Sequence, residues 1–221
     1  NYYSGNFLTL KNNVEKAVKF SVFTACLIIP VFLSAGEAIG SIIYADRAAG
    51  IYVKKGAITM LPMSITIITT SILNSLNKEK QSLVYSLSGA TALVLSIVFL
   101  PKYLGVDSLI LGMILSYSVT AVLNLRAVNK VCPKSPDTAS YIVRAATFVI
   151  PGCLAGYFAN NLFLPGAGEF FAAAISSVIS LGVPLILFYV FGMLDFDGKN
   201  QPAVRRERTR FSTGKKAKRS A

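Results

Sequence analysis

Residues that could carry out catalysis or bind a metal are few in this sequence. Histidine is absent, and the three cysteines, Cys26, Cys132 and Cys153, lie far apart without the spacing of zinc or iron ligands. The sequence contains neither a Gly-x-Ser-x-Gly elbow nor a glycine-rich loop of the kind that cradles phosphate. We therefore expect no catalysis by this chain alone, no metal and no cofactor.

One carboxylate, Glu37, lies inside a long apolar run, residues 20–44. A carboxylate deep in a membrane usually marks an ion relay or a substrate path, so Glu37 is a candidate cavity-lining or cation-sensing group. The alternative, which we favour, is that Glu37 opens a short interfacial helix over residues 37–44. That helix would explain why the run is longer than one membrane span needs.

Six stretches of the chain are apolar, and each is about as long as a bilayer is thick. They cover residues 20–44, 56–77, 81–101, 108–125, 145–168 and 170–194, with Glu37 as their single charged residue. About 20 apolar residues cross the ~30 Å hydrocarbon core as one α-helix. Hydrocarbon offers the backbone no hydrogen-bond partner, which leaves helices or closed barrels. The runs do not alternate as barrel strands do, and they lack the polar stripe of soluble helices.

We therefore predict an all-α fold, a polytopic membrane helix bundle with six transmembrane helices. The membrane domain is expected over residues 1–194, with spans near 18–36, 56–77, 82–100, 107–126, 143–163 and 170–193. Residues 195–221 are predicted to form a basic, disordered cytoplasmic tail, because they combine charge with Gln, Pro, Ser and Gly.

The distribution of Lys and Arg predicts which side the termini occupy. Six crossings place both termini on one side, and cytoplasmic loops are enriched in Lys and Arg. That side holds the tail together with Lys11, Lys16, Lys19, Lys78, Lys80, Arg126, Lys130, Lys134 and Arg144. The other side holds only Arg47, Lys54, Lys55 and Lys102, of which Lys54 and Lys55 count against the assignment. We expect both termini to be cytoplasmic.

The basic tail is a candidate contact for anionic membrane lipid. Basic residues next to a membrane are attracted to anionic headgroups by ~1 kcal/mol each. The residues expected to make this contact are Arg205, Arg206, Arg208, Arg210, Lys215 and Lys216. Binding to nucleic acid is disfavoured because, among the basic residues of 205–219, only Phe211 offers a base a stacking partner. A topology signal without any ligand is the remaining alternative.

Polar and helix-bending residues inside the runs give further candidates. Asn74 and Asn77, near the cytoplasmic end of the second run, are candidates for a substrate path, although bonding to a neighbouring helix is the interpretation we favour. Prolines that remove a helical hydrogen bond, and so permit bending or are simply tolerated, occur at Pro30, Pro62, Pro151 and Pro184. Gly152-x-x-x-Gly156 and the small residues of 172–177 predict close packing of the last two helices.

Several segments resemble one family of transporters. Leu-Lys-Asn at 10–12, an apolar stretch ending in Pro30 and Ala-Ile-Gly-Ser-Ile-Ile-Tyr at 38–44 resemble the start of the later half of polysaccharide and lipid II flippases. Ile-Leu-Asn-Ser-Leu-Asn-Lys at 72–78 is similar to the end of the next helix there, with Asn77 at a position where Gly is frequent. Leu-Pro-Lys-Tyr-Leu-Gly-Val at 100–106 resembles the hallmark outer loop of that family, followed by Asp107-Ser108 where relatives often carry Gly-Ala.

The branch it most resembles is that of stage V sporulation protein B and oligosaccharide flippases, in the multidrug/oligosaccharidyl-lipid/polysaccharide exporter superfamily. The resemblance implies the later of two lobes, lacking an N-terminal lobe that would hold the pyrophosphate of a polyprenyl-linked sugar. The absence of an initiator Met agrees with an incomplete chain. It also implies alternating access in a bacterial inner membrane. An apolar groove for the lipid tail would lie in the last two helices, with candidates Phe148, Leu154, Phe158, Ile175, Ile179, Leu185 and Phe188. These residues equally suit bilayer contact.

Three other functions remain open at this stage. A drug or cation antiporter of the same superfamily would need a carboxylate buried in a span, and only Glu37 could serve. A membrane transferase acting on polyprenyl substrates would need a cluster of Asp, Glu or His, but Asp107, Asp137 and Glu169 are isolated. A non-catalytic membrane scaffold recruited through its basic tail is the third.

The predicted orientation can be tested by labelling. Single cysteines in place of Lys102 and Lys130, in a chain without its native cysteines, should react with a membrane-impermeant maleimide from opposite sides of the membrane. Lys102 should be reached from outside the cell and Lys130 only after the membrane is opened. Labelling of both positions from one side would contradict the topology.

Overall fold

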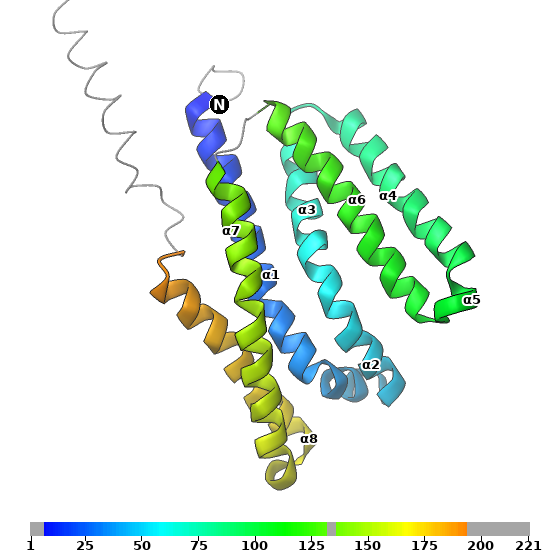
Figure 1. The fold of residues 1–221 in the computed structure, drawn as a ribbon, viewed down its shortest axis with the longest axis vertical. Helices are drawn as coiled ribbons and strands as arrows, with labels where there is room; N and C mark the ends of the chain where they lie inside the picture. The colour runs from blue at the N-terminus through cyan, green and yellow to red at the C-terminus, as the bar shows by residue number, and fades with distance from the viewer. Residues whose placement is uncertain (1–6, 132–135, 194–221) are drawn as a thin grey trace, which may run out of the picture.

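The computed structural model describes residues 7–131 and 136–193, and this part of the chain is helical apart from short connections (Figure 1). The elements are α1 (Phe7–Tyr44), α2 (Arg47–Gly56), the 3-10 turn η1 (Ala57–Thr59), α3 (Met60–Ser75), α4 (Glu79–Phe99), α5 (Pro101–Leu104), α6 (Asp107–Val131), α7 (Pro136–Thr147) and α8 (Val149–Val190). Within the described ranges there is no strand.

Six helical segments are long and apolar enough to cross a membrane. They are Leu10–Tyr44, Arg47–Ser75, Glu79–Phe99, Asp107–Val131, Tyr141–Leu162 and Phe170–Val190, and each overlaps one of the six apolar runs. The prediction of an all-α, polytopic membrane bundle is confirmed, and the chain is a multi-pass membrane protein.

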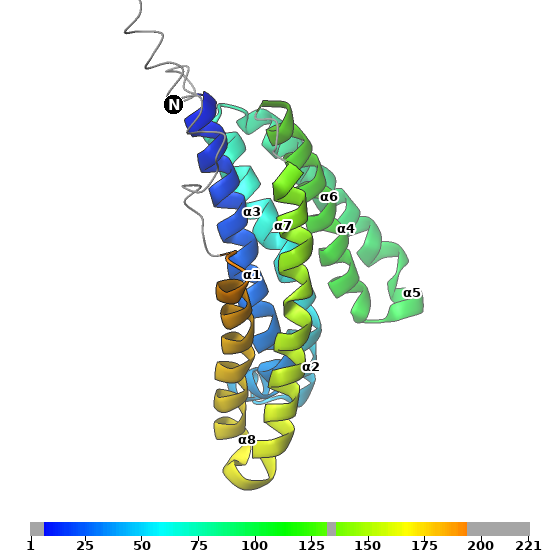
Figure 2. The same ribbon diagram turned by 60° about the vertical axis from the view of Figure 1, so that its left-hand side comes forward.

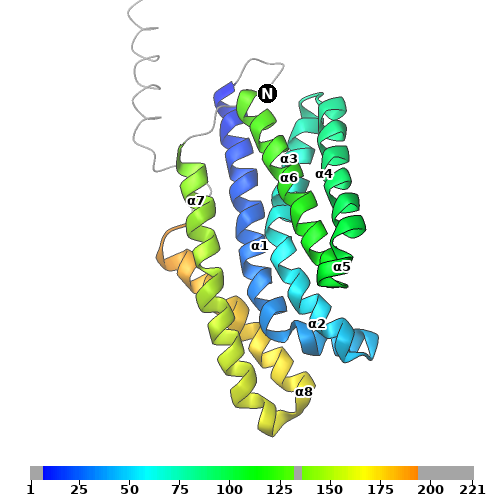
Figure 3. The same ribbon diagram turned by 45° about the vertical axis from the view of Figure 1, so that its right-hand side comes forward.

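The helices form an open row in the order α4, α6, α3, α1 and α8, with α7 beside α1 (Figures 1 and 3). α4 and α6 pack on α3, and in the described part of the chain no extensive contact joins either of them to α8. One end of the row, here called the amino-terminal end, holds the start of α1, the α3–α4 connection and the end of α6. The other, the α2 end, holds α2, α5 and the turn of α8.

α8 is helical along its length but folds back on itself, and its two arms are residues 149–162 and 170–190 (Figure 2). The Ser180 hydroxyl in the second arm donates a hydrogen bond to the carbonyl of Gly152 in the first, at 3.1 Å. The first arm completes the span Tyr141–Leu162, which begins in α7, and the second arm supplies the span Phe170–Val190.

α1 continues without a break from Phe7 to Tyr44, so the expectation of a separate interfacial helix over residues 37–44 is wrong. Nothing stops the helix at Glu37. The chain instead turns at Ala45, which has a φ of 53°. Asp46 then caps α2 by accepting a hydrogen bond from the backbone N–H of Ala48 at 2.9 Å. The short amphipathic helix therefore follows α1 rather than ending it.

The core runs along α1 and includes residues of α3, α6, α7 and α8. α1 contributes a buried residue every fourth position, at Val14, Val18, Val22 and Cys26, which is one face of a helix. Partners from the other elements that are almost fully buried include Leu73, Val128, Ala145 and Phe188. This stripe orients α1 so that it can contact α3 on one side and α8 on the other.

α1 and both arms of α8 meet at a junction of small and proline residues. A Cβ added to Gly152 would lie 2.6 Å from Cγ of Pro184 and 3.0 Å from Cγ of Pro30. The Ser34 hydroxyl donates to Ser180 Oγ at 3.1 Å one turn away. Close packing of the last two helices at Gly152 and Gly156 is thus confirmed, and α1 shares the contact.

α4 and α6 form a second close pair. The residues of α4 that are buried, Ser82, Gly89 and Ser96, are small, and they are seven positions apart on one face. Gly89 lies against Thr120 of α6, where no side chain could be added without displacing it. Because the buried face is so narrow, most of α4 presents apolar side chains to its surroundings.

Substitutions of glycine in α8 should separate close packing from helix propensity. Gly152→Ala should destabilise the protein by about 1–3 kcal/mol, because its methyl group would overlap the two proline rings. Gly182→Ala is the matched control, since a Cβ there meets nothing within 4 Å, and it should be neutral or stabilising by ~0.4–1 kcal/mol. Thermal unfolding in detergent measures both. Equal destabilisation by the two substitutions would contradict the packing role of Gly152.

Candidate functional site

The three predicted substrate-path residues lie at opposite ends of the bundle. Asn74 and Asn77 are exposed at the carboxyl end of α3, which lies at the amino-terminal end of the bundle, and Glu37 lies beside α2 at the other end. Asn77 adopts a φ of 57°, and the next residue, Lys78, donates its N–H to the carbonyl of Leu73 at 2.9 Å. This pattern is a Schellman cap, in which Asn fills the left-handed position that usually holds Gly. Asn77 therefore has a structural role in ending α3.

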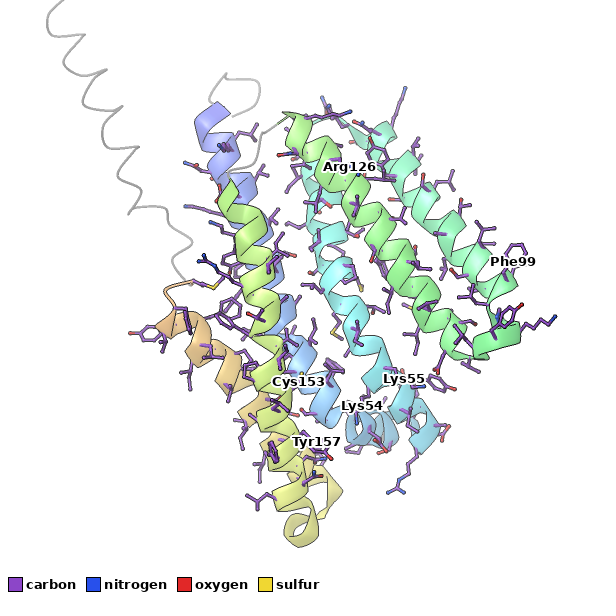
Figure 4. The ribbon with its side chains drawn as sticks, viewed as in Figure 1. Lys54, Lys55, Phe99, Arg126, Cys153 and Tyr157 are labelled. Atoms are coloured by element: carbon purple, nitrogen blue, oxygen red, sulfur yellow. The ribbon has the colours of Figure 1, made fainter. Side chains whose placement is uncertain are left out.

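Glu37 lies at the edge of the bundle. Its side chain is half exposed and its Oε2 is 3.9 Å from Nζ of Lys54, which is similarly exposed. Figure 4 shows Lys54 and Lys55 together at the α2 end. Around Glu37 the backbones of α1 and α2 touch, because Gly50 lies directly against the backbone of Glu37. The carboxylate thus has a lysine and solvent-facing space around it, which differs from the enclosed surroundings of a relay group.

Lys55 and Asp107 make the closest ion pair that the structure describes at the α2 end. Nζ of Lys55 lies 2.7 Å from both carboxylate oxygens of Asp107. The pair joins the last turn of α2 to the first residue of α6, across 52 positions of sequence. Sequence reasoning treated Asp107 as isolated, because no local pattern connects it with Lys55.

The candidates for a lipid-tail groove divide into two sets. Phe148 lies inside, with its ring centroid 5.2 Å from that of Phe188, and Phe188 is fully buried. Leu154 and Phe158 are exposed on the first arm of α8, at 53% and 67%. On the second arm, Ile175 and Ile179 are half-buried, and Leu185 is exposed. The structure therefore brings Phe148 and Phe188 into the core, not onto a shared surface with Leu154 and Phe158.

Asn124 is a buried polar residue that sequence reasoning did not single out. It is fully buried in α6 and its Nδ2 donates to Oγ1 of Thr70 in α3 at 2.9 Å. Nearby, the Thr66 hydroxyl donates to the carbonyl of Tyr117 at 3.0 Å. These bonds hold α3 against α6 within the apolar layer. A signal existed, since Asn124 is the single side-chain amide in the run 108–125.

A hollow of about 390 Å³ lies between α4 and α6 at the amino-terminal end of the bundle. Its walls are Tyr85 of α4 and five residues of α6: Leu123, Arg126, Ala127, Asn129 and Lys130. Sequence reasoning used Arg126 and Lys130 only to predict topology. The two are four residues apart and so share a helix face, a pattern that the sequence did contain.

Two other predicted features are located as follows. The anionic-lipid contacts proposed for the tail, at Arg205, Arg206, Arg208, Arg210, Lys215 and Lys216, lie outside the described residues. Among the residues that are described, no three His, Cys, Asp or Glu side chains gather as metal ligands would. Cys26 is buried in the core stripe and Cys153 is half-buried in α8.

Comparison of the chain with protein-family models, with curated proteins and with solved structures found no match.

The ion pairs at the α2 end should differ in strength. A double-mutant cycle of Lys55→Ala and Asp107→Asn should give a coupling energy near the upper end of the ~0.2–1 kcal/mol of exposed pairs, because both oxygens are contacted. The matched cycle of Lys54→Ala and Glu37→Gln should give a smaller coupling, because that pair is 3.9 Å apart. Denaturation in detergent measures each. A stronger Lys54–Glu37 coupling would contradict the geometry.

Proposed function

We propose that this chain forms the later lobe of an alternating-access flippase, which moves a polyprenyl-linked oligosaccharide or peptidoglycan precursor across a bacterial cytoplasmic membrane. The observation that carries the proposal is the open row of membrane helices. A closed bundle buries its own centre, whereas an open row leaves a broad face that a second lobe can cover. Two lobes that rock against each other enclose a cavity reached from alternate sides.

The arrangement of contacts supports a movable lobe. One wing, α4 with α6, attaches to α3, and the other, α7 with α8, attaches to α1. The second wing meets α1 at the α1–α8 junction, where Pro30 and Pro184 lie against Gly152. Each proline removes one helical hydrogen bond, so the helices can bend there at lower cost than elsewhere. Substrate would favour one conformation by binding it more tightly.

The positions of the charged residues indicate which lobe of the proposed carrier would bind each part of the substrate. The charged side chains described for this chain lie near the ends of its helices, so a buried pyrophosphate would be held by residues of the other lobe. The apolar surface of α8, with the exposed Leu154 and Phe158 and the half-buried Ile175 and Ile179, would contact the polyprenyl tail. Phe148 and Phe188 would support this surface from inside.

In this proposal the amino-terminal end of the bundle, where α1 begins, faces the cytoplasm, and both termini are cytoplasmic. Lys78, Arg126 and Lys130 lie at that end, in agreement with the enrichment of basic residues in cytoplasmic loops. The basic tail would then contact anionic lipid of the inner leaflet. A drug or cation antiporter is less well supported, because Glu37 is half exposed and has Lys54 beside it.

The proposal is tested with the protein encoded by the complete reading frame. That frame should contain further apolar spans with buried Arg or Lys. The protein, reconstituted in vesicles, should transfer a fluorescent polyprenyl-pyrophosphate sugar between leaflets, as measured by quenching from outside. Phe158→Ala should lower the transfer rate several-fold, and Leu87→Ala on α4, which is equally exposed at 67%, should not.

Two results would contradict the proposal. One is a reading frame that begins near Asn1, because a single lobe has no alternating cavity. The other is a complete protein, folded in vesicles, that leaves the lipid-linked sugar in its original leaflet.

A further inference from the structure

The hollow between α4 and α6 lies where the polar end of each helix gives way to its apolar run. Tyr85 lies a few residues inside α4, and Arg126 follows the last residue of the apolar run 108–125. About 390 Å³ is within the ~300–1,000 Å³ of small-molecule sites. Further along the pair the space ends, because Gly89 packs directly against Thr120. The hollow thus has the volume for a headgroup and is closed towards the middle of the bundle.

The charges that line the hollow are not compensated within the described residues. Arg126 and Lys130 are both exposed, and neither is in an ion pair there. Other lysines of the bundle differ: Lys19 lies 2.8 Å from Glu15, and Lys55 lies 2.7 Å from Asp107. Two cations one helical turn apart, facing a hollow without a carboxylate in its walls, create a site of positive potential.

Hydrogen-bond donors complete the lining. Nε2 of Gln81 donates to the Tyr85 hydroxyl at 2.6 Å, which leaves the phenolic O–H to donate to a ligand. The guanidinium of Arg126 offers a planar fork that matches two oxygens of a phosphate, and Lys130 adds a point charge. Phosphate is the group that this set of donors and charges fits.

The surface next to the hollow is apolar. Leu123 and Ala127 of α6 form part of the wall itself, and Val122, next to Leu123 in the chain, is 48% exposed. A phosphate bound in the hollow would therefore have alkyl-binding surface on the side towards the middle of the bilayer. A ligand with a phosphate and attached acyl chains matches both parts, whereas a soluble anion matches only the first.

We infer that the hollow formed by Tyr85, Leu123, Arg126, Ala127, Asn129 and Lys130 is a binding site for the phosphate headgroup of an anionic membrane phospholipid. The site is separate from the basic tail and does not depend on the proposed transport function. A lipid held there would bridge α4 and α6 at the membrane surface.

The test uses residues 1–221, which contain no tryptophan. Val122→Trp places one fluorophore on α6 beside Leu123, at a position that is 48% exposed. In phosphatidylcholine bilayers, a small fraction of phosphatidylglycerol with brominated acyl chains should quench this tryptophan more than the same fraction of brominated phosphatidylcholine. The ratio of the two gives the relative association constant at the site.

Two double variants in the Val122→Trp background carry the comparison. Arg126→Ala/Lys130→Ala should lower the preference for phosphatidylglycerol about 30-fold, because each of the two cations near the surface contributes roughly 1 kcal/mol. Lys78→Ala/Lys80→Ala removes two positive charges from the same end of the bundle, outside the hollow, and should leave the preference nearly unchanged. The tail is present in every variant, so its contribution cancels.

Several results would overturn the inference. An equal loss in both double variants would mean that general surface charge, not the hollow, attracts the lipid. Loss of the preference when inorganic phosphate replaces chloride at matched ionic strength would mean that the hollow binds a free anion. Arg126→Lys should keep much of the preference, because it keeps the positive charge. A helical circular dichroism spectrum equal to that of the parent shows that a variant is folded.

Discussion

Close approach of helix backbones at small residues is the interaction on which the rest of this bundle depends. Lipid is as apolar as a leucine side chain, so helices in a membrane gain little by burying leucine and associate mainly through dense packing and interhelical hydrogen bonds. Here Gly152 lies against Pro30 and Pro184, Gly89 lies against Thr120, and Gly40 lies against Gly50. These contacts join α1 to α8, α4 to α6 and α1 to α2. Larger residues there would force the helices apart.

Narrow contacts also explain why the helices form a row. A helix that buries only a strip of small residues, as α4 does with Ser82, Gly89 and Ser96, can hold one neighbour well and leaves its remaining surface uncovered. Interhelical hydrogen bonds also hold neighbouring helices together, as in the bond from Asn124 to Thr70 inside the apolar layer. The result is a pair of wings on a central α1–α3 contact, a shape suited to a lobe that must move against another.

Charge is placed almost wholly at the two ends of the bundle. At the α2 end, Lys54 and Lys55 have carboxylate partners in Glu37 and Asp107. At the amino-terminal end, Arg126 and Lys130 face a hollow instead, and no described carboxylate pairs with them. The two ends therefore offer different chemistry to the membrane surfaces they meet, and the basic one can attract phosphate.

Sequence alone determined the fold class. In hydrocarbon each backbone N–H and C=O needs a hydrogen-bond partner, and a helix supplies that partner from within the same segment, so every long apolar run becomes a helix. It also indicated Gly152 and Gly156 as packing sites, since small residues have few other uses there. It did not show that α1 continues through Glu37, pair Lys55 with Asp107, turn Phe148 and Phe188 inward, or close Arg126 and Lys130 around a hollow. Those features were decided by the tertiary structure, because each depends on how helices distant in sequence are rotated and spaced against one another.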